Sequence, residues 1–450
     1  MESNKPKFVF WNRTRFFVLF FSLLCMTLAQ INSLTFNFTV ICMNDVVQDS
    51  KTTNSSDVHW MESSSKKSLL FSAVAIGEIA GLIPSVPLID RYGIRIVLTV
   101  YGFISAASSI FFPLSVSFNY YTVILCRVLQ GFGTSILFTA VGVISGVWAP
   151  ENEMGTFLAV LSTAFQMGSI LAMSVSGVLC ESHFGWRSIY YLFGVLTFLG
   201  FVVFYVLYKD EPRQHRHISL SELSKIQHEK VVAVKESVPY KAISTDITVI
   251  MAWLSVFGGD IGFIILMIYG PTYLRDVLHF DVKTTGFASA LPYVLSALVK
   301  FSAGQLSDRC QFVSEKTRFT ICAIISQFGL AAIFLVMAIT SNQHVAHIAY
   351  TLAITIAGLN IMGTIKCVQL RCRQHVHFAV AVIGMMACLI QLLAPMGIGL
   401  LIKDNSEEQW SRLFIIISIL IFAFNLPFPF FTSAEPGPYV KTVEEKTDSV

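Results

Sequence analysis

The sequence predicts an all-α membrane protein with twelve transmembrane helices in two six-helix halves. Composition is the first reason, because 54% of the residues are hydrophobic and only 13% are charged, about half the charged share of an ordinary soluble domain. The second reason is that apolar runs of about eighteen residues or more recur along the chain, and each could cross roughly 30 Å of hydrocarbon as a helix. A membrane β-barrel would need alternating segments of about ten residues instead.

The apolar runs place the expected helices in order along the chain. The first run is too long for a removable signal peptide and lacks its small-residue cleavage site, so we expect it to remain as a helix. One long polar segment separates six runs from six more, and this predicts a linker. The expected domains are an N-terminal tail (1–15), a six-helix bundle (16–208), the linker (209–246), a second six-helix bundle (247–432) and a C-terminal tail (433–450). The expected spans are 16–44, 67–89, 96–117, 119–147, 154–180, 187–208, 247–270, 284–303, 319–340, 345–365, 378–402 and 412–432.

Lys and Arg residues set the expected orientation, because cytoplasmic loops near the membrane collect them. The N-terminal tail, the linker and the short turns on the same side are rich in both, whereas the opposite loops hold few. Both termini are therefore expected in the cytoplasm. The polar loop at 45–66 then faces the exterior or a lumen, and its sequon predicts a glycan at Asn54. The sequence leaves open whether the membrane is the plasma membrane or that of a lysosome or vesicle.

A short charged turn occurs once in each half. "PLIDRYGIRI" joins the second and third helices and contains Asp90, Arg91 and Arg95, while "GQLSDRC" joins the eighth and ninth and contains Asp308 and Arg309. A duplicated six-helix unit explains the match, and transporters built from two such halves expose a midplane site to each side in turn. We expect these charges to pair across the halves and govern that conformational exchange. The alternative is that any short cytoplasmic turn is charged.

Other motifs argue against a metal site, a cofactor or enzymatic activity. Cysteines inside the expected spans, Cys180 among them, are expected to pack as small hydrophobic residues, and no disulfide framework is visible. "KCVQLRCRQHVH" (366–377) has a spacing that fits no ordinary zinc site, and a plain basic loop is favoured there over S-acylation. Neither a P-loop nor a nucleophile elbow occurs, and the net charge of +3 needs no nucleic-acid partner. In the linker, "SLSE" (219–222) could open a short tethering helix by reciprocal capping.

Longer segments resemble a known family. The two charged turns are similar to the signature turns of the major facilitator superfamily. "RVLQGFGTSILFTAVGVISGVWAPENE" (127–153), "FGWRSIYYLFG" (184–194) and "APMGIGLL" (394–401) resemble the anion and phosphate transporters of solute carrier family 17, which includes sialin and the vesicular glutamate transporters. The resemblance implies twelve helices, a small organic or inorganic anion as substrate, and coupling to protons, sodium or membrane potential.

The sequence departs from that family at charged positions. The family's first helix usually carries an Arg two residues before an Asn, and here Thr35 precedes Asn37. Arg127 opens the family's helix 4 motif, but Thr134 stands where several members have an acidic residue tied to proton coupling. Helix 10 keeps little of its family segment beyond Gly358 and Asn360. These departures raise the alternative of a transport-impaired member that acts as a sensor or an uncoupled facilitative carrier.

Ionisable residues inside the expected spans are the strongest site candidates, because a charge in hydrocarbon costs several kcal/mol unless it faces protein or water. Arg127 has a fork of donors suited to a carboxylate or phosphate, so it either binds the substrate or forms a structural ion pair. Glu78 and Asp260 could each carry a proton or cation, or pair with Arg127. Polar residues that could line the same cavity, or act as hydrogen-bond glue between helices, are Asn37, Thr134 and Asn360.

Taken together, these patterns predict a secondary active transporter that moves a small anion by alternating access. Protons and sodium are the candidate coupling ions. We expect it to work as a monomer in the lipid bilayer, without a cofactor.

Overall fold

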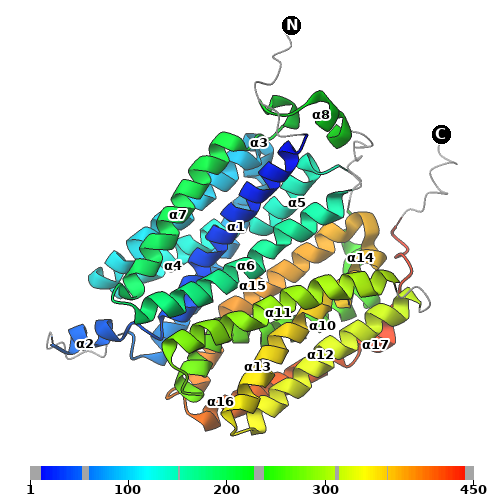
Figure 1. Cartoon of the computed structure of the whole chain (residues 1–450). Helices are drawn as coiled ribbons and strands as arrows, with labels where there is room; N and C mark the ends of the chain where they lie inside the picture. Colours follow the sequence, from blue (N-terminus) through cyan, green and yellow to red (C-terminus); the bar gives the residue numbers. More distant parts are fainter. Residues whose placement is uncertain are drawn as a thin grey trace. The chain divides into compact units, whose positions relative to one another are not determined.

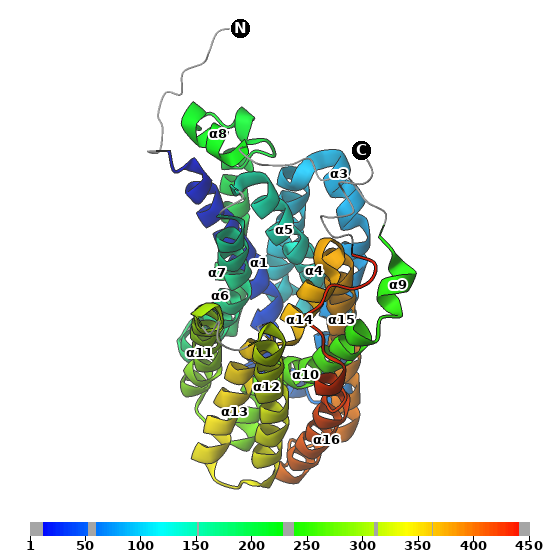
Figure 2. The same ribbon diagram turned by 90° about the vertical axis from the view of Figure 1, so that its right-hand side faces the viewer.

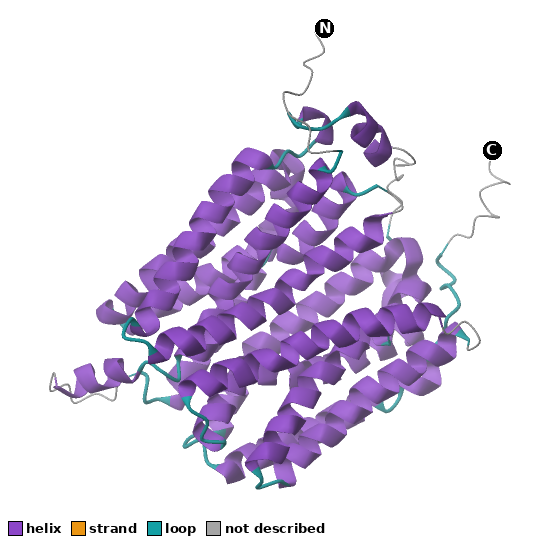
Figure 3. Ribbon diagram, in the orientation of Figure 1, coloured by secondary structure: helices purple, strands orange, loops and turns teal. Residues whose placement is uncertain are grey.

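The computed structural model describes residues 12–52, 60–150, 153–227, 238–309, 314–361 and 363–440. Within those ranges every regular element is a helix, and loops or turns join the helices (Figure 3). Eleven helices in the described ranges are long and apolar enough to cross a membrane, so the predicted all-α membrane class is confirmed. The chain divides into a first unit, Met1–Val234, and a second unit, Lys235–Val450.

The first unit consists mainly of long helices that pack side by side, coloured from blue to green in Figure 1. Helix α1 packs against α6 and α7, and α3 packs against α4 and α7. Helices α4 and α5 follow each other closely and together make one span, Tyr120–Trp148. The helices of this unit are α1 (Thr14–Thr39), α2 (Asn44–Thr52), α3 (Ser64–Phe118), α4 (Tyr120–Thr134), α5 (Leu137–Trp148), α6 (Met154–Glu181), α7 (Gly185–Leu207) and α8 (Leu220–Gln227).

Helix α3 accounts for two of the expected spans. It is 55 residues long, which at 1.5 Å per residue is roughly 80 Å, more than twice the thickness of the hydrocarbon. Gly93 interrupts it with a non-helical backbone at φ 78° and ψ 158°, a conformation that residues with a Cβ rarely adopt. A Cβ at Gly93 would also lie 2.4 Å from a carboxylate oxygen of Asp210. The expected turn between the second and third spans is therefore a sharp kink at this glycine.

A disulfide between Cys42 and Cys180 corrects the sequence-based interpretation of the cysteines. Cys180 was expected to pack as a small hydrophobic residue, but it lies near the end of α6, beside the end of α1 where Cys42 lies (Figure 1). The two cysteines are 138 residues apart, and spacing along the chain does not reveal which helices run side by side. Cys25 and Cys126 are free and buried, as expected for small hydrophobic residues.

The second unit has the same mainly helical construction. Helix α12 packs against α13 and α16, and α10 packs against α15, α16 and α14 (Figure 2). A π-helical turn, Tyr273–Val277, extends α10. The helices of this unit are α9 (Tyr240–Ser244), α10 (Ile247–Thr272), α11 (Val282–Arg309), α12 (Glu315–Ile339), α13 (Gln343–Ala357), α14 (Thr364–Cys372), α15 (Val376–Leu401), α16 (Glu407–Asn425) and α17 (Phe428–Phe431).

The tenth expected span differs from a simple helix. The sequence predicts a helix over 345–365 followed by a basic loop, but α13 gives way to a 3₁₀ turn at Gly358–Ile361 and helix then resumes as α14. The expected loop is therefore largely helical. Cys367 and Cys372 explain the difference, because both are fully buried in an apolar core with Trp253, and a helix satisfies the backbone polar groups of a buried segment.

Candidate functional site

Arg127 of α4 lies in the interior of the first unit, where 1% of its surface is exposed. Its Nε donates to the carbonyl oxygen of Leu70 (3.2 Å), and its Nη1 donates to that of Ser33 (2.9 Å) and to Oε1 of Gln130 (2.7 Å). The guanidinium carbon stands 4.9 Å from the centre of the Phe36 ring. These neighbours are all uncharged, and none of the ion pairs between described residues includes Arg127.

Helix α1 supplies one wall of this site. Asn37 follows Ser33 by four residues, so both lie on the face of α1 that Arg127 contacts. Asn37 is buried, with 4% of its surface exposed. The hydroxyl of Thr35 donates to the carbonyl oxygen of Ile31 within the same helix, so it does not replace the Arg of the family as a charged donor.

Glu78 of α3 and Thr134 of α4 are neighbours in the first unit. The Thr134 hydroxyl donates to Oε1 of Glu78 at 3.4 Å and to the carbonyl oxygen of Gly131 at 2.9 Å. The helices approach closely because Gly131 has no side chain; a Cβ there would lie 1.9 Å from the carbonyl oxygen of Val74. A carboxylate on α3 thus stands beside Thr134, the position at which the resemblance implies an acidic residue in several family members. Sequence spacing alone could not reveal this, because the two residues belong to different helices.

The remaining intramembrane candidates lie in the second unit. Asp260 is half-buried in α10, and its carboxylate makes no hydrogen bond or ion pair with another described residue. Asn360 lies in the 3₁₀ turn between α13 and α14; it is 8% exposed, and its Oδ1 has no hydrogen-bond partner in the described part of the chain.

The first charged turn is held in part by a residue that the sequence did not indicate. Asp90 and Arg91 are exposed. The backbone N–H of Arg95 donates to Oδ1 of Asp210 (2.9 Å), its Nε donates to the carbonyl oxygen of Tyr205 (2.7 Å), and its guanidinium carbon lies 4.2 Å from the centre of the Tyr205 ring. Arg95 is therefore tied to the last turn of α7 and to the chain that follows it.

Other residues named from the sequence cannot be placed as side chains. Asp308 and Arg309 form the end of α11, and their side chains lie outside the described part of the structure. Asn54 lies outside the described residues altogether.

An ion cluster at the start of α1, here called the first ion cluster, was not predicted. Arg15 Nε donates to Glu153 (2.9 Å), and Nη1 donates to Glu222 (3.2 Å), whose side chain is fully buried. Glu222 also accepts from the backbone N–H groups of Thr14 (3.1 Å) and Arg15 (3.0 Å), and Lys225 pairs with Glu153 at 2.6 Å. The hydrogen bonds from Arg15 hold the pKa of Glu153 below its usual range.

The linker helix behaves only partly as the sequence suggested. The Ser219 hydroxyl does accept from the backbone N–H of Glu222 at 3.1 Å, so the capping serine is confirmed. The carboxylate of Glu222 does not return to its own helix but caps the N-terminus of α1. The linker therefore anchors α1 as well as tethering the halves.

The second unit has a counterpart, here called the second ion cluster. Arg371 at the end of α14 donates to Asp246, the N-cap of α10, at 2.7 Å. The Tyr439 hydroxyl donates to the same carboxylate at 3.2 Å, and the backbone N–H of Gly437 donates to the carbonyl oxygen of Arg371 at 2.8 Å. In each unit an ion pair thus joins the start of the first span to the residues just before the fifth span. The arginine stands at the first span in the first unit (Arg15) but before the fifth span in the second unit (Arg371).

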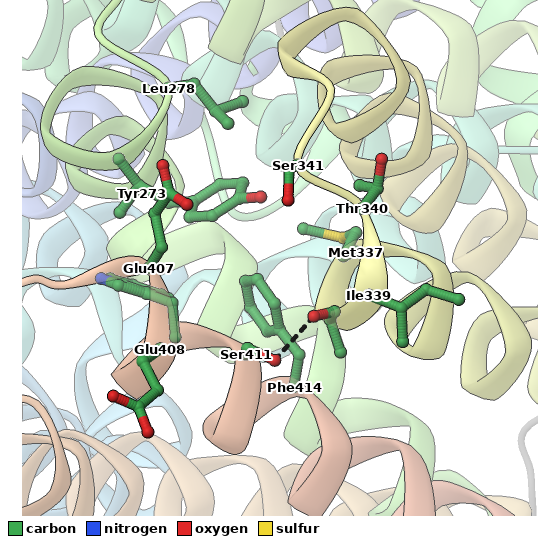
Figure 4. A pocket seen from close by; sticks show the side chains of 13 residues that line it. Tyr273, Leu278, Met337, Ile339, Thr340, Ser341, Glu407, Glu408, Ser411 and Phe414 are labelled. Carbon is green, nitrogen blue, oxygen red and sulfur yellow. Dashed lines mark hydrogen bonds between the residues drawn. The ribbon is translucent and has the colours of Figure 1, made fainter.

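A cavity of about 230 Å³ in the second unit is a poor match for an anion. It lies between the π-helical turn, the end of α12 and the start of α16. Figure 4 shows Glu407 and Glu408 on one side of it and Thr340 and Ser341 on the other. Two carboxylates and no Lys or Arg are among the described residues that line it, so its field repels a negative substrate.

Comparisons with known proteins agree with this architecture. A family model described as Major Facilitator Superfamily matches residues 16–395. The chain is 27% identical over 403 residues to sodium-dependent phosphate transport protein 1 of Homo sapiens, covering 82% of this chain and 84% of that protein. It is 25% identical over 325 residues to sialin of Homo sapiens, covering 70% of this chain and 65% of sialin.

Solved structures show the same fold at lower identity. A bacterial homolog of the human lysosomal transporter Spinster, inward-facing and occupied, superposes with a TM-score of 0.70 at 13% identity, over 93% of this chain and 98% of that one. A D-xylose-proton symporter gives a TM-score of 0.69 at 16% identity, over 93% of this chain and 99% of its own. The resemblance to solute carrier family 17 is confirmed by the relatives, which are transport proteins and not enzymes. Because the family model spans most of the sequence, this chain belongs to the Major Facilitator Superfamily.

Proposed function

We propose that the protein is a secondary active transporter that carries a small organic or inorganic anion by alternating access. The observation that supports this most directly is the hydrogen bonding of Arg127. A guanidinium has five N–H donors, and the bonds from Nε and Nη1 use three of them. The two donors of Nη2 have no acceptor among the described residues. A permanently charged group inside the span Tyr120–Trp148 is costly unless an anion or water reaches it.

The names of the relatives support an oxyanion as the substrate. One is a sodium-dependent phosphate transport protein and another is a vesicular glutamate transporter. Phosphate and carboxylate groups both accept paired hydrogen bonds from a guanidinium. Asn37 lies on the same face of α1 as Ser33, and we propose that it adds an amide donor to such a substrate.

Glu78 is the residue that we propose for proton coupling. Several family members carry an acidic residue at the position of Thr134, and here the adjacent carboxylate of Glu78 takes its place across the helix interface. A carboxylate in this position acts electrostatically on Arg127, so protonation of Glu78 would change how strongly Arg127 attracts an anion. Asp260 is a second candidate in the other unit.

Uptake into proteoliposomes tests the proposed function. We expect phosphate or a small carboxylate to accumulate when an inward proton or sodium gradient is imposed, whereas a neutral sugar should not. The Arg127→Ala variant, reconstituted in equal amount, is the control. Uptake that is the same with and without each gradient would indicate an uncoupled carrier. A folded protein that takes up no anion would indicate a sensor.

Asp90→Asn is expected to slow transport several-fold and to leave the relative preference among anions unchanged. Asp90 is exposed at the turn between the two spans of α3, whereas Arg127 lies within α4, so the turn is proposed to set the rate of conformational exchange. Asp308→Asn in the matching turn of the second unit should likewise slow transport without changing the relative preference among anions. Competition between two anions measures preference, and Glu211→Gln, which removes an exposed acid from the neighbouring linker, is the matched control. A normal rate with altered preference would contradict this assignment.

Asn54→Gln is expected to abolish the glycosidase-sensitive mass of the protein. We propose that both termini are cytoplasmic and that the loop after α1 faces the exterior or a lumen. The disulfide that joins Cys42 and Cys180 supports this orientation, because disulfides persist in oxidising compartments. Gel mobility with and without glycosidase measures the effect. Asn12→Gln removes a sequon on the proposed cytoplasmic side and should change nothing; the reverse result would invert the proposed topology.

A further inference from the structure

A polar cluster lies in the interior of the second unit, made by Ser255 of α10, Gln327 of α12, Thr364 of α14 and Asn425 of α16. Each of these side chains is at most 2% exposed. The Ser255 hydroxyl donates to Oδ1 of Asn425 and lies 3.2 Å from the Thr364 hydroxyl. Ser255, Thr364 and Asn425 therefore bring hydroxyl and amide oxygens from three helices together inside an apolar bundle.

Two consecutive glycines let the amides reach the backbone of α10. A Cβ at Gly258 would lie 3.0 Å from Nδ2 of Asn425, and a Cβ at Gly259 would lie 2.3 Å from Oε1 of Gln327. Positions 255 and 259 are one helical turn apart and share a face, so the oxygens of Ser255 and Gln327 lie against the same strip of α10. Larger residues at the glycine positions would fill this space.

One oxygen of the cluster has no internal partner. Oε1 of Gln327 is buried and accepts no hydrogen bond from a described residue. Leaving such an acceptor unpaired in an apolar environment is unfavourable, most of all where no water can reach it. The helix next to the cluster is also interrupted, because a 3₁₀ turn separates α13 from α14 just before Thr364. Transporters use interrupted helices of this kind to coordinate small cations.

We propose that the polar cluster binds a monovalent alkali cation, with sodium as the physiological ion. The donors are hydroxyl and amide oxygens, which suit a hard cation, and the cluster has no thiol or imidazole for a transition metal. It also lacks the several carboxylates typical of calcium sites. The inference rests on the proposed function in one respect only, namely that the bound sodium ion would be the coupling ion for anion transport.

Thermal unfolding of the purified full-length protein, followed by tryptophan fluorescence, tests the proposal without anion or transport. With sodium chloride replacing potassium chloride at constant ionic strength, the wild-type midpoint should rise and saturate, because a ligand that binds only the folded state stabilises it. Gln327→Leu and Ser255→Ala should lose the sodium-specific rise. Gln327→Glu, which adds a negative charge, should reach saturation at a several-fold lower sodium concentration.

Thr351→Val is the matched control, because Thr351 also has a buried hydroxyl without a described partner but does not belong to the cluster. It should keep the sodium-specific rise. Equal wild-type midpoints in sodium and potassium would overturn the proposal, and so would a rise that survives in both Gln327→Leu and Ser255→Ala. The unfolding measurement does not depend on anion uptake. The cation-site proposal and the proposed transport function can therefore fail independently.

Discussion

Replacing Arg127 with Lys is expected to raise the anion concentration for half-maximal uptake by about 10- to 100-fold, because hydrogen bonds to charged groups contribute about 1.5–3 kcal/mol. Lysine keeps the positive charge and has three donors. Three bonds already hold the native side chain to Leu70, Ser33 and Gln130, so a lysine that replaces them has no donor left for the substrate. Folding and delivery to the membrane should be preserved, which surface labelling checks.

Gln130→Glu is a sharper companion to that substitution. It is nearly isosteric, and it places a carboxylate where the amide oxygen now lies 2.7 Å from Nη1 of Arg127. An internal ion pair should then compete with the substrate, so uptake should fall at least as far as in Arg127→Lys while the protein stays folded. Wild-type affinity in both variants would show that Arg127 serves only to hold α1, α3 and α4 together.

Replacing Glu78 with Gln is expected to abolish the stimulation of uptake by an inward proton gradient and to leave downhill uptake measurable. Glutamine preserves the size of the side chain and can still accept the hydrogen bond from Thr134, but it cannot exchange a proton. Uptake measured with and without an imposed pH difference, at equal anion concentration, gives the ratio that should fall to one. Asp260→Asn, a matching neutralisation in the second unit, shows whether that carboxylate shares the role.

Moving the carboxylate back to α4 is the complementary test. In the double variant Glu78→Ala with Thr134→Glu, the acid stands at the family's usual position and alanine provides space for it. Because the two side chains are in hydrogen-bond contact, gradient stimulation should return at least in part. Two results would show that Glu78 is not the coupling group. One is full stimulation by the proton gradient in Glu78→Gln. The other is stimulation in Glu78→Ala alone together with its absence in the double variant.

Much of the fold could be predicted because a membrane span is recognised from the length and hydrophobicity of one run of consecutive residues. The runs around Arg127 and Asp260 are long and apolar, and both form helical spans in the structure. The kink between the second and third spans was expected as a turn, since proline and charged residues occur there. The interruption near Asn360 was not, because its surroundings are as apolar as those of an ordinary span.

The contacts that define the site were harder to predict, because they join residues far apart in the chain. Arg127 was identified from its charge, but two of its partners are backbone carbonyl groups of α1 and α3. Every residue has such a group, so residue type does not indicate which ones accept these hydrogen bonds. The contact of Glu78 with Thr134 depends on close packing at Gly131. Glu222 appeared as part of a local capping motif, yet its carboxylate bonds to residues more than two hundred positions away.

The two ion clusters differ in when their members become available during synthesis. Arg15, Glu153 and Glu222 all precede the first span of the second unit, so the start of α1 can be anchored while the ribosome is still producing later helices. Domains generally fold in this order as they emerge. The second cluster, by contrast, is complete only when Tyr439 has been added after the last span. The first unit can therefore mature early, whereas the second acquires its full set of contacts only after its last span has been made.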